Sequence, residues 1–405
     1  MTAHYKTPAL QLSARHHVLR NKPLSVIVTI ICAVLPVSAQ EMNPAPSSAP
    51  VAAGVQSAAS LPFIVLSGHT ADLWGASFSP DGSRVVTASS DMTAKVWDAR
   101  TGVLIFTLSG HDEAVRSVAF SADGSKLATA CRNGRAKVWD AAKGTLSAEI
   151  TGHQEMIESI GFSPDGLRIV TSSRDAKAKI WDAKSGALMT TLEGHTEWLS
   201  GAEFSPDNSK ILTSSSDKSA RVWDGTTGAA LFTLAGHDGL VTSAVFSPDG
   251  SRIATSSSDK TAKIWSSADG ALLLTFTGHE RAALRVAFSP DGLKIVTTSS
   301  DKTGKVWDAQ SGALLATLQG AHKRLIPRVM FSADGKRIVT ASHDKTAVVW
   351  DAITGAVMAV LAGHIKEVDG ASFSPGGTHV LTVSYDKTAR IWDIRTLLGG
   401  DSPGR

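Results

Sequence analysis

After residue 60 the chain alternates short runs of apolar and polar residues with clusters of Gly, Asp, Pro and Ser. One such stretch covers residues 157–192 and contains β-rich runs at 157–162, 168–173, 178–182 and 187–192. The breaks between these runs read Ser-Pro-Asp-Gly, Arg-Asp and Lys-Ser-Gly, which are turn-forming sequences. The pattern predicts a meander of four antiparallel strands, and no helical period occurs beyond residue 60.

Two landmarks, a histidine and a tryptophan, repeat along the chain at a constant distance. One interval is longer by a single position, the inserted Ala321, and the distance from each histidine to its tryptophan is the same in every repeat. Because the landmarks recur eight times, a solenoid or a propeller has to be considered before any other fold. The histidines and tryptophans are His69, His111, His153, His195, His237, His279, His322 and His364, and Trp97, Trp139, Trp181, Trp223, Trp265, Trp307, Trp350 and Trp392.

These motifs resemble those of the WD40 family of β-propellers. The resemblance covers residues 61–397 and rests on Gly-His, on Phe-Ser-Pro-Asp-Gly as at 162–166, and on Ser-x-Asp-Lys-Thr with Trp-Asp at 299–308. It implies an all-β fold, a single eight-bladed propeller with four antiparallel strands per blade. Few positions depart from the pattern, and none removes a whole strand; they are Asn133, Ser266, Ala321 and the turn at 373–377.

The count of strands predicts how the ring closes. After Trp392 no good outer strand follows, whereas residues 61–66 form an extra apolar run before the first Gly-His. We therefore expect this N-terminal strand to complete the eighth blade beside the C-terminal strands, as is usual in the family. Closure removes the exposed sheet edges that invite aggregation.

Each repeat carries a His, a Thr, an Asp and a Trp in this order and at constant offsets, with Asn in place of Asp in the second repeat. A His, a hydroxyl and a carboxylate together suggest a hydrolase. A hydrogen-bond chain from the indole through Thr and His to Asp satisfies every group, however, and the family is known for such a structural tetrad. We interpret all eight sets as structural and expect no catalytic residue; the sets are His69, Thr87, Asp91, Trp97; His111, Thr129, Asn133, Trp139; His153, Thr171, Asp175, Trp181; His195, Thr213, Asp217, Trp223; His237, Thr255, Asp259, Trp265; His279, Thr297, Asp301, Trp307; His322, Thr340, Asp344, Trp350; and His364, Thr382, Asp386, Trp392.

Two details of the tetrads stay open in the sequence. The hydroxyl could instead come from the residue two before the aspartate, such as Ser215, which lies on the same strand face. Cys131 holds that position in the second repeat, where it is either a small packing residue or a reactive thiol. Asn133 replaces the aspartate there, so we expect the second blade to be the softest.

The differences between the repeats point to a binding surface. In this family partner-binding side chains lie on the narrow face, three and five residues after the histidine and one before the turn aspartate. At these positions blades five and six hold only Leu, Ala, Thr and Ser. The other blades bring acidic residues together with Trp, Tyr and Arg, the residue types that are enriched in binding hot spots. The alternative is a set of solvated loop residues with local ion pairs, Arg116 with Glu158 for example; the candidate set is Asp72, Trp74, Arg116, Arg132, Glu158, Arg174, Trp198, His343, Glu367, Asp369 and Tyr385.

The first 39 residues have the features of a secretory signal peptide. Four basic residues and no acidic one accompany the uncharged run 24–39, which ends in Val-Ser-Ala. We expect cleavage after Ala39; an uncleaved membrane anchor is the alternative, although the run is short for a bilayer. Residues 40–60 are rich in Pro, Ala and Ser and are interpreted as a linker, and residues 398–405 as a tail.

Composition narrows the functional classes. The chain is 42% hydrophobic and 19% charged, which excludes a protein that is disordered over its whole length. Its two cysteines exclude a small protein held together by several disulfides. The formal net charge of +3 belongs to the leader, because removing its four basic residues leaves about −1. A protein near neutrality without a basic tail is a poor nucleic-acid binder.

The sequence therefore favours a non-catalytic protein-interaction module, periplasmic or secreted, that binds a protein or peptide partner on its narrow face. We expect a monomer without metal or cofactor, in contact with a membrane only if the leader stays attached. Two alternatives remain, a propeller enzyme or cofactor-binding propeller of the quinoprotein type, and a sugar-binding propeller. Fold alone does not decide among them.

Overall fold

The computed structural model describes residues 61–398, which form 32 β-strands and a single turn of 3-10 helix, η2 (Arg395–Leu398). The predicted signal peptide, the linker, and the tail beyond Leu398 lie outside these described residues. The strands make eight separate four-stranded sheets, which we call blades one to eight. The all-β prediction is confirmed, with η2 as the one helical element of the described range; its Leu397 N–H donates to the Ile394 carbonyl at 2.9 Å.

Blades one to four each consist of four strands that follow one another in the chain, from the centre of the ring outwards. They are β2 (Leu73–Phe78), β3 (Arg84–Ser89), β4 (Ala94–Asp98) and β5 (Leu104–Leu108); β6 (Val115–Phe120), β7 (Lys126–Cys131), β8 (Ala136–Asp140) and β9 (Leu146–Ile150); β10 (Ile157–Phe162), β11 (Arg168–Ser173), β12 (Ala178–Asp182) and β13 (Leu188–Leu192); and β14 (Leu199–Phe204), β15 (Lys210–Ser215), β16 (Ser219–Asp224) and β17 (Ala230–Ala235).

Blades five to seven repeat this order, and blade eight takes its outer strand from the start of the described chain. They are β18 (Val241–Phe246), β19 (Arg252–Ser257), β20 (Ala262–Ser266) and β21 (Leu272–Phe276); β22 (Ala283–Phe288), β23 (Lys294–Ser299), β24 (Gly304–Asp308) and β25 (Leu314–Leu318); β26 (Arg328–Phe331), β27 (Arg337–Ala341), β28 (Thr346–Asp351) and β29 (Val357–Ala362); and β30 (Val368–Phe373), β31 (His379–Ser384) and β32 (Ala389–Asp393), with β1 (Phe63–Leu66) outermost.

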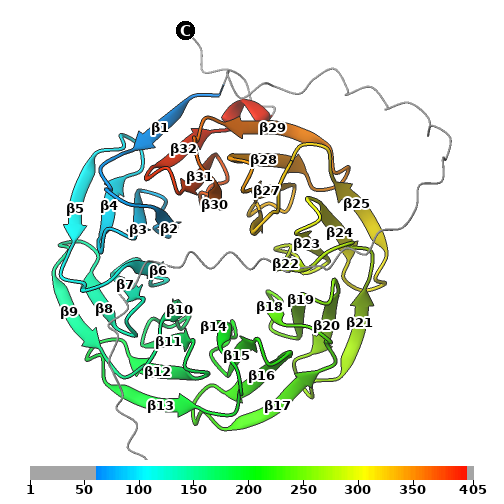
Figure 1. The fold of residues 1–405 in the computed structure, drawn as a ribbon, viewed down its shortest axis with the longest axis horizontal. Coiled ribbons are helices and arrows are strands. Elements are labelled where there is room, and N and C mark those ends of the chain that lie inside the picture. Colours follow the sequence, from blue (N-terminus) through cyan, green and yellow to red (C-terminus); the bar gives the residue numbers. More distant parts are fainter. Residues whose placement is uncertain (1–60, 399–405) are drawn as a thin grey trace, which may run out of the picture. The chain divides into compact units, whose positions relative to one another are not determined.

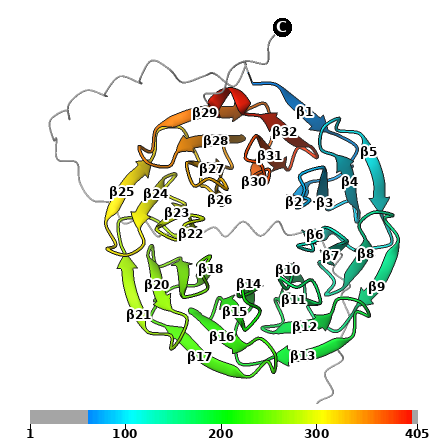
Figure 2. The same ribbon diagram turned by 180° about the vertical axis from the view of Figure 1, so that it is seen from behind.

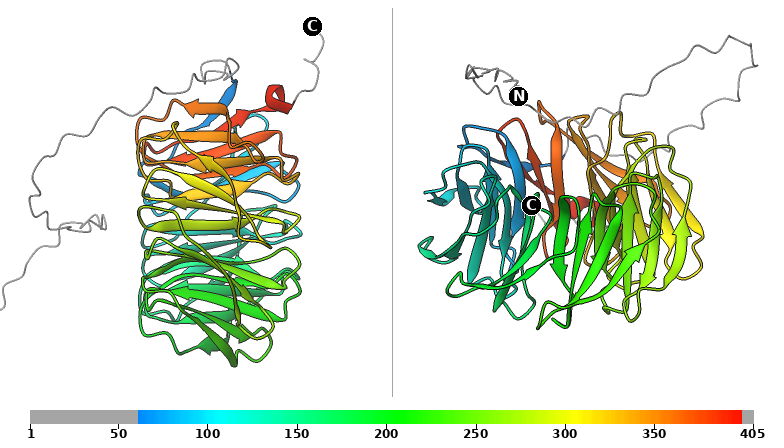
Figure 3. Two further views of the ribbon diagram at one scale, coloured as in Figure 1. Left: turned by 90° about the vertical axis from the view of Figure 1, so that its right-hand side faces the viewer. Right: turned by 60° about the horizontal axis from the view of Figure 1, so that its bottom comes forward.

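The eight blades of residues 61–398 form a closed ring. The first strands of successive blades contact one another, and β30 of the last blade contacts β2 of the first. Figure 1 shows these inner strands around the centre and the fourth strands along the rim, Figure 2 shows the same arrangement from behind, and Figure 3 shows the blades from two further sides. The predicted eight-bladed propeller is confirmed.

The ring closes through β1, as the strand count predicts. β1 pairs antiparallel with β32, with Phe63 opposite Trp392 and Leu66 opposite Ala389, and the two aromatic rings lie 4.6 Å apart. The Asp393 N–H also donates to the Pro62 carbonyl at 2.9 Å. The N-terminal strand therefore covers the edge of the last blade that no C-terminal strand covers.

The hydrophobic core lies between blades rather than in one centre. Each cluster of buried residues combines apolar side chains of one blade with the tetrad tryptophan of the next blade. In one such cluster Val138 of blade two packs with Ile169 and Trp181 of blade three. The closing interface is of the same kind, with Leu66 and Ile391 of blade eight against Trp97 of blade one. Because every blade packs on two neighbours, losing one strand uncovers core on both sides.

The Ser-Pro-Asp-Gly turns are fixed by their own side chains. In blade three the Ser163 hydroxyl donates to Asp165 at 2.5 Å and accepts the Arg168 N–H at 2.9 Å, while the Gly166 N–H donates to the Ser163 carbonyl at 2.8 Å. Gly166 has a φ of 67°, a left-handed conformation that costs glycine little. The turn chemistry thus sets the register in which β10 meets β11.

The inner strand pair of seven blades contains a β-bulge at one position. In blade one Leu73 pairs with Ser89 and Gly75 with Ala88, so Trp74 is the unpaired residue. The same shift occurs in blades two, three, four, five, six and eight, always at the fifth residue after the histidine. A bulge redirects the side chain of its extra residue. The positions picked out as a binding surface therefore include the bulge residues themselves.

Blade seven departs from this geometry. Its inner strand β26 pairs with β27 without a register shift and begins only at Arg328. Pro327 occupies the bulge position and has no N–H to offer, and the strand begins two residues later than in the other blades. Within residues 61–398 no helix combines the length and the apolar character that crossing a bilayer requires.

Candidate functional site

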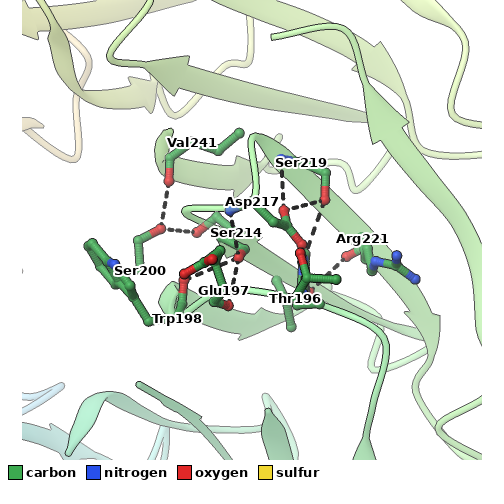
Figure 4. Close-up of polar contacts among 12 residues, drawn as sticks. Thr196, Glu197, Trp198, Ser200, Ser214, Asp217, Ser219, Arg221 and Val241 are labelled. Atoms are coloured by element: carbon green, nitrogen blue, oxygen red, sulfur yellow. Dashed lines mark hydrogen bonds and ion pairs between the residues drawn. The ribbon is translucent and has the colours of Figure 1, made fainter. Parts of the chain in front are cut away.

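The tetrad of blade four is a continuous hydrogen-bonded chain. The Trp223 indole N–H donates to the Thr213 hydroxyl at 2.9 Å, His195 Nε2 lies 2.8 Å from the same hydroxyl, and His195 Nδ1 lies 2.6 Å from Asp217. Asp217 also accepts the Thr196 N–H at 3.2 Å and the Ser219 hydroxyl at 2.6 Å (Figure 4). One tautomer satisfies the chain, with the proton on Nδ1 and the Thr hydroxyl donating to Nε2.

Six other blades repeat this chain with nearly the same distances. His Nδ1 lies 2.7–3.1 Å from Asp and His Nε2 2.7–2.9 Å from Thr, and the indole N–H to Thr distances are 2.8–2.9 Å. The alternative hydroxyl does not take this place, because Ser215 donates to the carbonyls of Glu197 and Trp198. The tetrads brought together in this way are those of His69, His153, His195, His237, His279, His322 and His364.

Burial and hydrogen bonds keep these groups in fixed charge states. Burial lowers the pKa of His195, although Asp217 works in the opposite direction, so the ring is neutral at pH 7. Burial alone would raise the pKa of the Asp217 carboxyl, but hydrogen bonds from Ser219 and His195 lower it overall. A neutral ring that donates to an ionised carboxylate is the arrangement a packed core tolerates.

The tetrad hydroxyls are not placed for nucleophilic attack. Thr213 has no exposed surface, its oxygen accepts the Trp223 N–H, and its hydroxyl proton points to His195. A substrate would have to enter the space between two blades to reach this oxygen. The tetrads therefore hold the loops onto the strands, and their buried hydroxyls are not accessible to a substrate.

Blade two does not form the predicted tetrad, and Asn133 is the residue that fails. His111 Nδ1 lies 2.8 Å from the Cys131 sulfur, whereas the Asn133 side-chain oxygen accepts the Arg135 N–H at 3.2 Å. Thr129 and Trp139 keep their places, at 2.7 Å from His111 Nε2 and 2.8 Å from Thr129. An amide has no carboxylate charge to attract an imidazole N–H, so the thiol takes the position instead.

This substitution reverses the proton arrangement of the histidine. Burial raises the pKa of the Cys131 thiol to about 12 and lowers the pKa of His111 to about 4, so both groups are neutral. A neutral thiol donates its proton to Nδ1, which leaves the ring proton on Nε2 for Thr129. Cys131 is fully buried, and its environment opposes the thiolate that a reactive cysteine needs.

Backbone hydrogen bonds bring the three candidate binding positions of every blade together. The N–H of the residue before the turn aspartate donates to the carbonyl of the residue three after the histidine. Examples are Ser90 to Asp72 at 2.9 Å, and Tyr385 to Glu367 at 3.0 Å. The bulge residue lies between them, so these positions form one patch per blade.

Within three blades the bulge residue bonds to the residue before the turn aspartate. The Trp74 indole N–H donates to Ser90 at 2.5 Å, Arg174 donates to Glu158 at 2.6 Å, and the Tyr385 hydroxyl donates to Asp369 at 3.1 Å. Blade two has two arginines at these positions and cannot pair in the same way. Its bulge residue Arg116 turns to the neighbouring blade instead.

Contacts between blades join these pairs into one continuous arc. Tyr385 of blade eight packs on Trp74 of blade one, with ring centres 5.0 Å apart, and the Arg116 guanidinium lies 4.7 Å from the Trp74 ring. Arg116 reaches Glu158 of blade three at 3.4 Å. The two ends are His343, 3.4 Å from Asp369, and Trp198, whose ring lies 5.5 Å from the Arg174 guanidinium. We call this set, from His343 through blades eight, one, two and three to Trp198, the aromatic–arginine arc.

Two acidic members of the candidate surface are buried supports. The Glu158 side chain is 8% exposed between Arg116 and Arg174, and the Asp369 side chain is 12% exposed beneath His343 and Tyr385. Both were predicted as part of the partner-binding set, with a local ion pair as the alternative for Glu158. In the structure their oxygens already accept hydrogen bonds from the residues above them. They hold the exposed residues in place.

The remaining candidates lie at the edge of the arc. Asp72 is 3.5 Å from Lys366, and Glu367 is 3.4 Å from Arg324. Arg132 is exposed and has no ion pair or hydrogen bond from its side chain within residues 61–398. Exposed pairs of this kind contribute little to stability, so these residues remain free to change partners.

The arc leaves part of its surface open. Trp198 is 36% exposed and the Arg174 side chain 42%, whereas Trp74 and Tyr385 are half-buried. Figure 4 shows the Trp198 indole beside the polar contacts of blade four. Of the side chains described, none forms a group of three or more His, Cys, Asp or Glu suited to a metal ion.

Two residues of the site escaped sequence reasoning. The sixth residue after the histidine is Gly or Ser in six repeats but Arg285 and Arg328 in the other two. Both arginines lie half-buried at the centre of the ring. Comparing the repeats at this position would have revealed the exception, although not the direction of the side chains.

The comparisons with known proteins agree with this geometry. A solved structure that the chain resembles is the crystal structure of the computationally designed Ika8 protein, with a TM-score of 0.73 and 28% sequence identity over 81% of this chain and 98% of that chain. No curated protein matches the chain. The family model described as WD domain, G-beta repeat matches residues 61–98, 102–140, 144–182, 186–224, 228–266, 270–308, 312–351 and 355–393.

The sequence repeats and the blades are offset by one strand. The first matched segment, residues 61–98, groups β1 with β2–β4, whereas in the structure β1 belongs to the sheet of β30–β32. This offset links the first repeat to the last blade and closes the ring. Eight matched repeats that cover most of the sequence, folded into eight blades, show that the chain belongs to the WD40 repeat family of β-propeller proteins.

Proposed function

We propose that this protein is a non-catalytic interaction module that acts outside the cytoplasm and binds a protein partner through the aromatic–arginine arc. Proteins of the WD40 family generally bind protein partners. The observation that carries the proposal is the continuity of the arc. Contacts link five residues from five different blades in series, with Glu158 between the two arginines; the five are Tyr385, Trp74, Arg116, Arg174 and Trp198.

The chemistry of the arc suits protein recognition. Trp, Tyr and Arg dominate the hot spots of protein interfaces because they combine large contact area with directional polar groups. Hydrogen bonds and ring contacts already fix Trp74 and Tyr385, so binding costs less side-chain entropy than it would at mobile residues. At the corresponding positions blades five and six hold Leu240, Ala282 and Leu284.

A catalytic role for the repeated His, Thr and Asp is less well supported. The threonine hydroxyls are buried and already hydrogen-bonded. The proposed enzyme and cofactor-binding alternatives would need a different, unique cluster. Absorbance and metal analysis of the purified protein test those alternatives, and a glycan array tests the sugar-binding alternative.

The proposed location follows from the leader sequence. Residues 1–39 combine a basic flank, an apolar run and small residues before Ala39. Expression with the full leader should yield a periplasmic or secreted protein whose N-terminus is Gln40, as read by mass spectrometry. An intact N-terminus in the cytoplasmic fraction would contradict this part of the proposal.

A pair of matched substitutions tests the binding surface. Trp198 and Leu240 occupy the same position in successive blades and are 36% and 37% exposed. The partner is captured from a cell-envelope extract, identified by mass spectrometry, purified and titrated against each variant. Trp198→Ala should weaken binding by about tenfold or more, whereas Leu240→Ala should leave it unchanged. Equal effects of the two substitutions would contradict the placement of the partner on the arc.

A further inference from the structure

The centre of the ring holds a cavity of about 510 Å³. Inner strands from β6 to β26 line it, mostly with Ser, Gly, Ala and Val, so the walls are small and weakly polar. Its charged residues are Glu158, Glu203, Arg285 and Arg328. A cavity of this volume is within the range that binds small molecules.

Arg285 is held in the cavity wall by backbone carbonyls alone. Its Nε donates to the Pro327 carbonyl at 3.3 Å and its Nη1 to the Thr242 carbonyl at 3.4 Å. Both hydrogen bonds are long, and they use two of the five N–H groups of the guanidinium. The other donors have no acceptor within residues 61–398.

Arg328 follows in the next blade at the equivalent position. Its side chain makes no hydrogen bond or ion pair with any residue of the described range 61–398. The two arginines repel each other: the charge of Arg328, followed by burial, lowers the pKa of Arg285 to about 9. Two neighbouring cations therefore share a half-buried site without a direct ion pair from the described residues, although the more distant charge of Asp369 partly offsets them.

The nearby carboxylates are engaged elsewhere. Glu158 accepts hydrogen bonds or ion pairs from Arg116 and Arg174, and Asp369 from His343 and Tyr385. Glu203 lies in β14 of blade four, where burial raises its pKa to about 7 and its side chain accepts the Phe246 N–H. None of these groups forms an ion pair with either arginine.

From this geometry we propose that the central cavity is an oxyanion-binding site in which Arg285 and Arg328 together hold a carboxylate or a phosphate. Guanidinium groups present parallel N–H donors that match the oxygens of both anions. An anion between the two guanidinium groups would also offset their mutual repulsion. The low polarity of the walls would strengthen the attraction between the anion and the arginines. The cavity shares Glu158 with the arc, but its proposed ligand is a small anion, so its test requires no protein partner.

Titration with inorganic phosphate tests the site directly. We expect phosphate to bind the wild-type protein and raise its melting temperature at constant ionic strength, because a ligand of the folded state stabilises it. Arg285→Gln and Arg328→Gln should each weaken binding by about tenfold or more. Arg100→Gln removes an exposed arginine that is distant in sequence from the residues of the cavity, so phosphate binding should not change.

A second probe distinguishes the source of the anion. The peptide acetyl-Gly-Glu-Gly-amide presents one carboxylate as an acidic side chain would, and its Gln counterpart lacks the charge. Binding of phosphate shows a site for free anions, and binding of the Glu peptide alone shows a site for an acidic side chain; either outcome supports the oxyanion site. Binding of neither probe, or equal binding by wild type and both glutamine variants, would overturn it.

The stability of the anion-free protein gives an independent readout. In a buffer without oxyanions at low salt, Arg328→Gln should melt at the same temperature as the wild type or higher, since it removes a like-charge repulsion. The conservative Arg328→Lys keeps the charge and should not gain stability in this way. If Arg328→Gln loses stability while Arg328→Lys retains it, Arg328 has a counterion and the proposal fails.

Discussion

The guanidinium of Arg116 lies 4.7 Å from the centre of the Trp74 ring, although the two residues belong to different blades and to successive repeats of the sequence. Each occupies the bulge position of its own repeat. The repeat that builds the ring thus also places unlike side chains next to each other around its centre. In this way a nearly periodic sequence produces a surface that is not periodic.

Substitution of Arg116 and Trp74 singly and together should reveal their contact. A cation over a partly buried indole contributes about 0.5–2 kcal/mol, so the effects of Arg116→Ala and Trp74→Ala on the free energy of unfolding should fail to add by about 1 kcal/mol. Denaturant unfolding of the four proteins measures this coupling. The exposed Arg100 replaces Arg116 in a control cycle, where additive effects are expected; additivity in both cycles would contradict the contact.

Closure by β1 can be tested within a single strand. Leu66 is 1% exposed in the core between blades eight and one, whereas the adjacent Val65 is 42% exposed. Leu66→Ala should lower the free energy of unfolding by about 2–5 kcal/mol, and Val65→Ala by less than about 0.5 kcal/mol. Deleting residues 61–66 should lower the melting temperature sharply. An unchanged melt of the deletion would show that β1 does not close the ring.

Blade two should gain stability when it receives the residues of its neighbours. Cys131→Ser with Asn133→Asp supplies the carboxylate that seven other blades place beside the histidine, and we expect about 1–2 kcal/mol of added stability. The reverse change in blade three, Asp175→Asn, should destabilise the protein by a similar amount. Chemical denaturation measures both. A loss of stability in blade two would mean that the His111–Cys131 contact is the better partner.

Stability should fall on acidification in two steps. The pKa of His111 is lowered by burial to about 4 from an ordinary 6.5, so below pH 6.5 the unfolded chain takes up a proton that the folded protein refuses. This one residue costs up to about 2 kcal/mol at pH 5, and burial also lowers the pKa of His195, His237 and His364.

The second step belongs to the carboxylates. Burial would raise the pKa of Asp301, yet hydrogen bonds from His279 and Thr303 lower it overall, so its contribution is complete above about pH 4 and disappears as the pH falls further. Denaturation midpoints at pH 7.5 and 5.5 trace the first step, and midpoints at pH 4 and about 2.5 trace the second. A midpoint that stays constant or rises between pH 7.5 and 5.5 would contradict neutral, buried histidines.

The strands were predictable because turn-forming residues mark their ends, and the alternation of apolar and polar residues marks their length. The runs at 157–162, 168–173 and 178–182 match β10, β11 and β12, whereas the expected run 187–192 begins one residue later, at Leu188. The closing strand begins at Phe63 rather than at residue 61, because Pro62 contributes only its carbonyl to the ladder. Local sequence determines such elements almost completely.

The contacts around the candidate site could be known only from the three-dimensional structure. Sequence places Asp369 at a surface position, but only the three-dimensional structure shows His343 and Tyr385 covering it. The sequence also could not indicate that Cys131, rather than Asn133, would contact His111. These outcomes depend on which neighbouring side chains compete for the same space.

The affinity of the purified partner for a variant with four substitutions tests the proposed function most directly. The variant carries Trp74→Ala, Arg174→Ala, Trp198→Ala and Tyr385→Ala, and circular dichroism and thermal melting establish that it is folded. We predict that binding is lost, while a control with Leu240→Ala and Leu284→Ala at the matching positions of blades five and six binds like the wild type. Retained affinity in the folded four-residue variant would contradict a partner-binding role for the arc.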